Sequence, residues 1–139
     1  MKKLLANIIA ILLASCVATS TALPQPKYIH HHTARVTYYY PQPPYGSKVA
    51  CSKTKYANEG TTVAAHPDFK FGTKLYIPEL KNSVDDGYFI VQDRGQAVTS
   101  KRASNGRAYV VDVFVKSRSR LQHLTKTEPA YMKVYVVSP

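Results

Sequence analysis

Short stretches of apolar and β-branched residues alternate along the chain with polar segments that carry glycine or proline. Stretches of this length and composition are typical of β-strands, and the residues between them are those that chain reversals require. The pattern predicts six strands, over residues 35–40, 61–65, 74–77, 88–92, 109–115 and 133–137. Strands spaced this closely indicate an all-β domain, folded as a barrel or a sandwich.

One segment has the periodicity of a helix instead. Between Ser117 and Leu124, the leucines Leu121 and Leu124 stand three positions apart, a serine lies near the start, and basic residues follow it. This spacing predicts one short helix between the last two strands.

The N-terminal residues have the features of an export signal. Lys2 and Lys3 precede a largely apolar run from Leu4 to Leu13, which is too short to span a bilayer. The run ends in Leu13-Ala14-Ser15-Cys16, which resembles the lipobox of bacterial lipoproteins, where the cysteine is lipidated and becomes the new N-terminus. We therefore expect a signal peptide over residues 1–16 and a cell-envelope protein anchored to the membrane through Cys16.

A second interpretation of the leader stays open. Ordinary cleavage after Ala22, with Ser20 as the other small residue, would remove residues 1–22 and release a secreted protein. On either route Cys16 is acylated or discarded, so Cys51 is left without an intrachain partner. The sequence therefore predicts a domain with no internal disulfide.

Residues 17–33 are rich in proline, threonine and serine and show no apolar period. This composition predicts a flexible tether, followed by the domain over residues 34–139. His30, His31 and His32 fall within the tether, and three adjacent imidazoles on a flexible chain do not enclose a metal ion. We therefore expect no metal and no other cofactor.

The chain of 139 residues has the length of one domain with one core, and we expect a monomer. Its formal net charge is +11, and loss of Lys2 and Lys3 leaves 17 basic against 8 acidic residues, a charge of +9. Such a charge attracts anions, which for an exported protein are membrane lipids and cell-wall polymers rather than nucleic acid. Because the same charge also serves solubility, it does not identify the partner by itself.

Two aspartates depart from the strand pattern. Asp112 lies within the apolar stretch 109–115, where an unpaired buried carboxylate is costly. It either faces solvent, pairs with an arginine such as Arg94 or Arg107, or stands at the rim of a cleft. Asp93 follows the strand 88–92 and opens a turn, which is a common place for a catalytic group and also for an aspartate that merely binds the turn backbone.

Two further residues carry potential chemistry. His66 follows the strand 61–65 and, taken alone, has the character of a structural histidine. Cys51 with His66 would form a thiol nucleophile and its base, although a lone cysteine beside lysines is expected to be structural.

Four ordered blocks are similar to a known family pattern. They are Ala64-Ala65-His66, residues 71–77 (Phe-Gly-Thr-Lys-Leu-Tyr-Ile), Val91-Gln92-Asp93-Arg94-Gly95 and Val110-Val111-Asp112. Their order and spacing resemble rare lipoprotein A and the 3D domain of membrane-bound lytic transglycosylase A, over residues 35–137. The resemblance implies a six-stranded double-psi β-barrel that cleaves the glycan strands of peptidoglycan.

The resemblance also assigns roles. Asp93 matches the aspartate of the family's Asp-Arg-Gly block and is implied as the acid, His66 matches the histidine of rare lipoprotein A, and Asp112 matches the later aspartate that both relatives share. Glu59 lies in a segment similar to one that carries a functional glutamate, although the stretch from Glu59 to His66 is shorter here. The 3D proteins usually have aspartate at the position of His66, and Gln96-Ala97 departs from both relatives, which leaves the substrate preference open.

Lytic cleavage needs a proton donor at the glycosidic oxygen and then a base for the muramic acid 6-hydroxyl. Asp93 would serve as both if a nearby Asp112 kept it partly protonated. A wider gap between the carboxyls would seat a water molecule and allow hydrolysis. The alternative from another class is a non-catalytic, expansin-like wall-binding module, and a third is an interaction protein that uses the barrel only as a scaffold.

Overall fold

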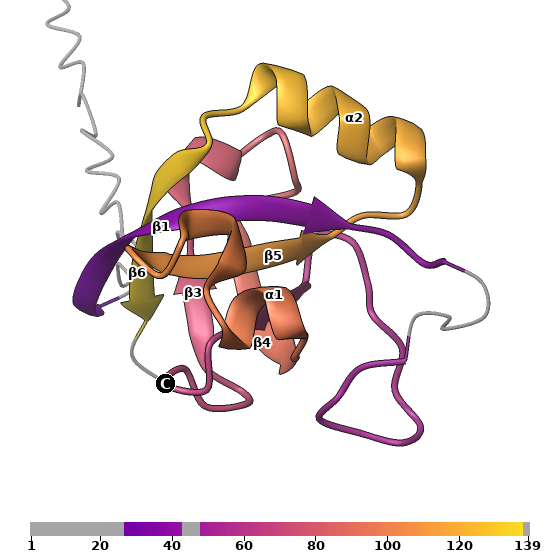
Figure 1. Ribbon diagram of the computed structural model, residues 1–139, viewed down its shortest axis with the longest axis horizontal. Coiled ribbons are helices and arrows are strands. Elements are labelled where there is room, and N and C mark those ends of the chain that lie inside the picture. Colours follow the sequence, from indigo (N-terminus) through magenta and orange to yellow (C-terminus); the bar gives the residue numbers. More distant parts are fainter. Residues whose placement is uncertain (1–26, 43–47, 138–139) are drawn as a thin grey trace, which may run out of the picture.

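The computed structural model describes residues 27–42 and 48–137 (Figure 1). Each of the six predicted strands is present, so the all-β class is confirmed. The strands are β1 (Tyr28–Tyr39), β2 (Thr62–Ala65), β3 (Lys74–Tyr76), β4 (Tyr88–Asp93), β5 (Tyr109–Phe114) and β6 (Tyr131–Val137). The helices are α1 (Gln96–Thr99), α2 (Arg118–Thr127) and the 3₁₀ turns η1 (Pro78–Leu80) and η2 (Arg102–Ser104).

The six strands pair in a closed ring in the order β1-β5-β2-β4-β3-β6, with β6 returning to β1. The β1–β5 and β2–β4 pairs are parallel, and the other four are antiparallel. Closure gives each strand two neighbours, which removes the exposed edges that an open sheet would present. The ring encloses a core of alternate strand residues, among them Val36, Val63, Leu75, Phe89, Val91, Val111, Val113, Met132 and Val134.

The two α-helices lie on different parts of the barrel surface. In Figure 1, α2 lies above β1 while α1 lies below β5, and the contacts agree, since α2 packs on β1 and α1 on β5 and β2. The predicted helix is confirmed as α2, whose cap residue Ser117 accepts a hydrogen bond from the Arg120 N–H at 3.2 Å. The expectation of a single helix is wrong. Because α1 is one turn with Val98 as its buried residue, it produces no repeating apolar pattern.

Strand β1 begins before the expected domain boundary. Residues 28–33, which were expected in the tether, pair with β6 from Tyr28↔Val137 to Thr33↔Lys133 and help to close the ring. The histidines of this segment are therefore strand residues. Residues 1–16, Cys16 and the part of the tether before Lys27 lie outside the described residues. Within residues 27–42 and 48–137, no helix has the length and apolar character that crossing a membrane requires.

Candidate functional site

Asp93 and Asp112 lie in one cross-strand row. Asp112 on β5 pairs with Thr37 on β1 and with Ala64 on β2, and Ala64 pairs in turn with Asp93 on β4. Paired residues point to the same face of a sheet, so the side chains of this carboxylate row (Thr37, Asp112, Ala64 and Asp93) share one face. Because one strand separates the aspartates, their Cα atoms are about 10 Å apart.

An irregularity in β4 turns Asp93 toward this face. Val63 pairs with Val91, yet the next residue, Ala64, pairs with Asp93, so Gln92 is an extra residue on β4. Such a bulge re-aims the side chain that follows it. Val91 therefore stays in the core while Asp93 joins the outer row.

Asp93 is held by three hydrogen-bond donors. The Tyr39 hydroxyl donates to Oδ2 at 2.8 Å, and the backbone N–H groups of Ala50 and Arg94 both donate to Oδ1 at 2.9 Å. Burial, followed by the charge of Asp93, raises the pKa of Tyr39 above its ordinary value, so the phenol remains a donor. This arrangement presents Asp93 as a fixed acceptor.

Asp112 has a different environment. It lies on the outer face of β5 between Val110 and Phe114, each of which is buried in a small cluster outside the main core. Burial raises the pKa of Asp112 to about 6, the hydrogen bond donated by Thr37 at 2.9 Å opposes this shift, and the charge of Asp93 adds to it. The sequence hypothesis gave the shared proton to Asp93, whereas the structure gives the raised pKa to Asp112.

Arg94 fixes the loop after β2 onto the end of β4. Its Nη1 donates to the Asp93 carbonyl at 2.9 Å and its Nη2 donates to the Phe69 carbonyl at 2.5 Å. The guanidinium also lies 4.1 Å from the centre of the Phe71 ring, as in a cation–π contact. Arg94 therefore positions the backbone on both sides of the site and does not pair with Asp112.

His66 lies at the same end of the barrel as Asp93 but has other partners. Its Nδ1 is 3.2 Å from Oδ2 of Asp68, and its ring packs at 5.5 Å against that of Tyr109. This position follows from the strand directions, since β2 and β4 are parallel and both end there. Its described contacts join it to Asp68 and Tyr109 rather than to the aspartates of the row.

Glu59 is not brought to the carboxylate row. Its Oε1 is 3.0 Å from Nε of Arg120 on α2, and its Oε2 accepts the Lys116 N–H at 2.9 Å. Arg120 also donates to the Ser83 carbonyl. In this structure Glu59 joins the segment before β2 to the helix, so its contacts are structural.

Cys51 and Tyr39 complete the surroundings of Asp93. Within the described residues Cys51 is a free, exposed cysteine. Its backbone N–H donates a hydrogen bond to the Gln92 carbonyl at 3.0 Å. It therefore lies beside Asp93, whereas His66 contacts Asp68 and Tyr109, so the structure does not support a Cys51–His66 pair. Sequence analysis missed the role of Tyr39, because strand tyrosines are ordinary packing residues and the strand order of the ring, in which β5 and β2 separate β1 from β4, is needed to see that this hydroxyl reaches Asp93.

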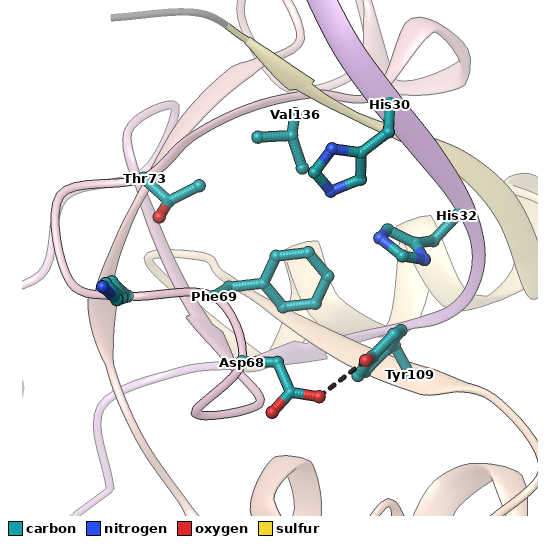
Figure 2. Close-up of a pocket in the computed structure, with 8 residues that line it drawn as sticks. His30, His32, Asp68, Phe69, Thr73, Tyr109 and Val136 are labelled. Atoms are coloured by element: carbon teal, nitrogen blue, oxygen red, sulfur yellow. Dashed lines mark hydrogen bonds between the residues drawn. The ribbon is translucent and has the colours of Figure 1, made fainter.

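A cavity of about 440 Å³ lies at this end of the barrel (Figure 2). Its lining comes from β1, β5, β6 and the loop after β2, and consists of His30, His32, Asp68, Phe69, Lys70, Thr73, Tyr109 and Val136. Neither aspartate of the carboxylate row lines it. In the part of the chain that the structure describes, no group of three or more histidine, cysteine, aspartate or glutamate side chains is arranged to hold a metal ion.

Comparison of the chain with protein-family models, with curated proteins and with solved structures finds no match. One carboxyl whose pKa is raised to about 6 by burial and one that is held as an acceptor form a pair suited to proton transfer.

Proposed function

We propose that the protein cleaves the glycan strands of peptidoglycan, with Asp93 and Asp112 as its working carboxyls. The observation that carries the proposal is the single cross-strand row that holds both aspartates on one face in unlike environments. A carboxyl whose pKa is raised by burial, close to a second carboxyl, is typical of acid–base catalysis. The finer fold that we propose is the double-psi arrangement of the rare lipoprotein A and 3D-domain proteins that the sequence resembles.

In the proposed reaction, protonated Asp112 donates its proton to the glycosidic oxygen as the bond from that oxygen to the anomeric carbon of muramic acid breaks. Asp93 then accepts the proton of the 6-hydroxyl as this oxygen bonds to the same carbon, which gives a 1,6-anhydro product. The sequence-based hypothesis assigned both proton transfers to Asp93. Here each of the two carboxyls carries out one of them. If a water molecule attacks instead, the same pair produces a reducing end.

The compartment and the partner follow the same proposal. The leader and the lipobox-like Cys16 point to export into the cell envelope, either anchored to the membrane or secreted, where peptidoglycan is found. The basic chain suits a polymer that carries carboxylates, because long-range attraction raises the rate of encounter.

A non-catalytic wall-binding module is the second candidate function. The observation that favours it is the aromatic-lined cavity at the same end of the barrel as Asp93. The lining of this cavity includes neither Asp93 nor Asp112. In this case Asp93 would fix the backbone around it and carry out no chemistry.

The test is incubation of intact and peptide-stripped peptidoglycan with the purified protein, followed by mass spectrometry of the soluble products. We expect 1,6-anhydromuramyl products from the wild type and at least about a hundredfold less from Asp93→Asn and Asp112→Asn, as is typical for loss of a general acid or base. Asp86→Asn is the matched control, because it makes the same chemical change at an exposed aspartate whose recorded contact is a turn hydrogen bond to Tyr88.

Each other outcome has a definite meaning. Reducing-end products that depend on both aspartates indicate hydrolysis by the same pair. Absence of products from both substrates, with retained binding to the wall polymer, would replace cleavage by the binding function. Equal product from Asp93→Asn and wild type would remove Asp93 from the reaction.

A further inference from the structure

The cavity at the end of the barrel has walls of packed aromatic rings. Figure 2 shows His30 and His32 projecting from β1 toward the Phe69 ring, with Thr73 across the cavity from them. The His32 ring meets Phe69 edge to face at a centroid distance of 5.4 Å and Tyr109 at 5.0 Å, and Phe69 meets Tyr109 at 4.9 Å. Mutual edge-to-face packing holds each ring in place, so the walls are formed before a ligand arrives.

One carboxylate in this cavity is oriented by its neighbours. The Tyr109 hydroxyl donates to Oδ2 of Asp68 at 2.6 Å, and Nδ1 of His66 is 3.2 Å from the same oxygen. The hydrogen bond from Tyr109, with a smaller effect of His66, lowers the pKa of Asp68, so this group stays ionised. Among the described residues the recorded contacts of the carboxylate use Oδ2 alone, which leaves Oδ1 as an acceptor for a ligand hydroxyl.

The other polar groups of the lining are largely balanced in charge. Lys70 offsets the charge of Asp68, and Thr73 contributes a neutral hydroxyl. Burial, aided by the neighbouring His30 and His31, lowers the pKa of His32, so its imidazole is neutral near pH 7 and both donates and accepts hydrogen bonds. Such a lining suits a ligand that is uncharged and rich in hydroxyl groups.

The geometry points to a binding site for one sugar ring, an N-acetylated amino sugar of a glycan strand. The C–H face of a pyranose would pack on the aromatic wall while its hydroxyls bond Oδ1 of Asp68 and the His32 imidazole, and the volume of about 440 Å³ lies within the range of small-ligand sites. The choice of sugar rests on the proposed function.

One hydrogen bond and one short stretch of chain connect this sugar pocket to the carboxylate row. Phe69, in its wall, accepts a hydrogen bond through its carbonyl from Arg94, the residue that follows Asp93. His66 contacts both Asp68 and Tyr109 and lies two residues after Ala64, the member of the row between the two aspartates. A glycan that places one sugar in the pocket would therefore extend toward the row, and the pocket would position the strand for cleavage.

The test is a binding titration of the purified protein with N-acetylglucosamine oligomers and with peptide-stripped glycan strands, beside glucose oligomers that lack the acetamido group. We expect Asp68→Asn and Thr73→Val to bind the acetylated probes about tenfold more weakly, which corresponds to loss of about 1.4 kcal/mol. Asp86→Asn is the control for the loss of charge. Thermal unfolding of each variant identifies any loss that is due to misfolding, and Thr73→Val keeps the shape of the side chain.

Affinities within twofold of the wild type for both pocket variants would overturn the sugar pocket, as would equal binding of the glucose oligomers. The pocket and the proposed cleavage can fail separately. Binding that depends on the pocket residues, without any products, would support the sugar pocket and contradict the proposed cleavage. Products formed by Asp68→Asn and Thr73→Val with unchanged KM and kcat would support the cleavage and contradict the sugar pocket.

Discussion

The proton that Asp112 holds has a consequence for stability. Its pKa is about 6 in the folded protein, above the value of about 3.9 for an aspartate in an unfolded chain. Between these values the folded state binds more protons than the unfolded state, so the free energy of unfolding falls as the pH rises. The contribution is present below about pH 4 and is lost by about pH 6.

We therefore predict that Asp112→Asn is more stable than the wild type at neutral pH, because the amide avoids an ionised carboxyl in a partly buried position. The gain is at most about 3 kcal/mol, since each pKa unit corresponds to about 1.4 kcal/mol and solvent reduces the effect. Urea unfolding of both proteins at pH 4, 5, 6 and 7 measures it. The prediction is contradicted if the difference between the two proteins does not grow between pH 4 and 6.

Two neighbouring tyrosines allow a matched comparison. Tyr39 donates to the Asp93 carboxylate, whereas the buried Tyr38 hydroxyl has no hydrogen-bond partner among the described residues. We predict that Tyr39→Phe lowers the free energy of unfolding by about 1.5–3 kcal/mol, because it removes a hydrogen bond to a charged group, and that Tyr38→Phe is neutral or stabilising. Denaturant unfolding at one pH compares them. Equal losses would show that the phenol of Tyr39 does not hold Asp93.

At the scale of elements, polar contacts near both ends of α2 attach it to the rest of the chain, with Arg120 near its start and Glu128 at its C-terminal cap. Arg120 pairs with Glu59 and donates to the Ser83 carbonyl, and Leu124 supplies the helix's buried residue. We predict that Glu59→Gln and Arg120→Gln each destabilise the protein by about 1 kcal/mol, and that the double variant loses less than the sum. A double-mutant cycle of unfolding free energies measures the coupling. Additive losses would mean that the two side chains act independently.

The elements that sequence analysis predicted correctly are those whose own residues specify them. Each of the six strands lies in a short stretch of apolar, β-branched or aromatic residues, and α2 has a cap residue and two leucines three positions apart. The site was predictable only in part. Asp93 and Asp112 stood out as carboxyls in apolar strands, but the bulge at Gln92 that aims Asp93 outward depends on pairing with β2, for which β4 carries no local signal.

The same reasoning explains where the structure departs from the expectations based on sequence. Residues 28–33 have the polar composition of a tether, and it is pairing with β6 that makes them a strand, since their outward side chains remain largely exposed. Glu59 matched a family segment by sequence, yet its position in space is decided by Arg120, far along the chain. In both cases a partner that is distant in sequence determines the structure.

For the whole molecule, the first half of β1 determines whether the barrel is closed. β1 is the only strand joining β5 to β6 in the described ring, and its pairing with β6 extends from Tyr28 to Arg35. A chain that starts at Ala34, the boundary suggested by composition, would keep the β1–β5 pairs but lose five of the seven pairs between β1 and β6. It would also lose His30 and His32 from the cavity wall.

We predict that such a chain loses cooperative unfolding, because the part of β6 that loses its partner exposes both an unpaired edge and the core residues Val134 and Val136. A chain that starts at Lys27 keeps every described pair and is the control. Circular dichroism during heating and hydrogen exchange of the β6 amides compare the two. If the shorter chain melts as one unit at the same temperature as the longer one, β1 before Ala34 is dispensable and the closure of the barrel depends on contacts elsewhere in the ring.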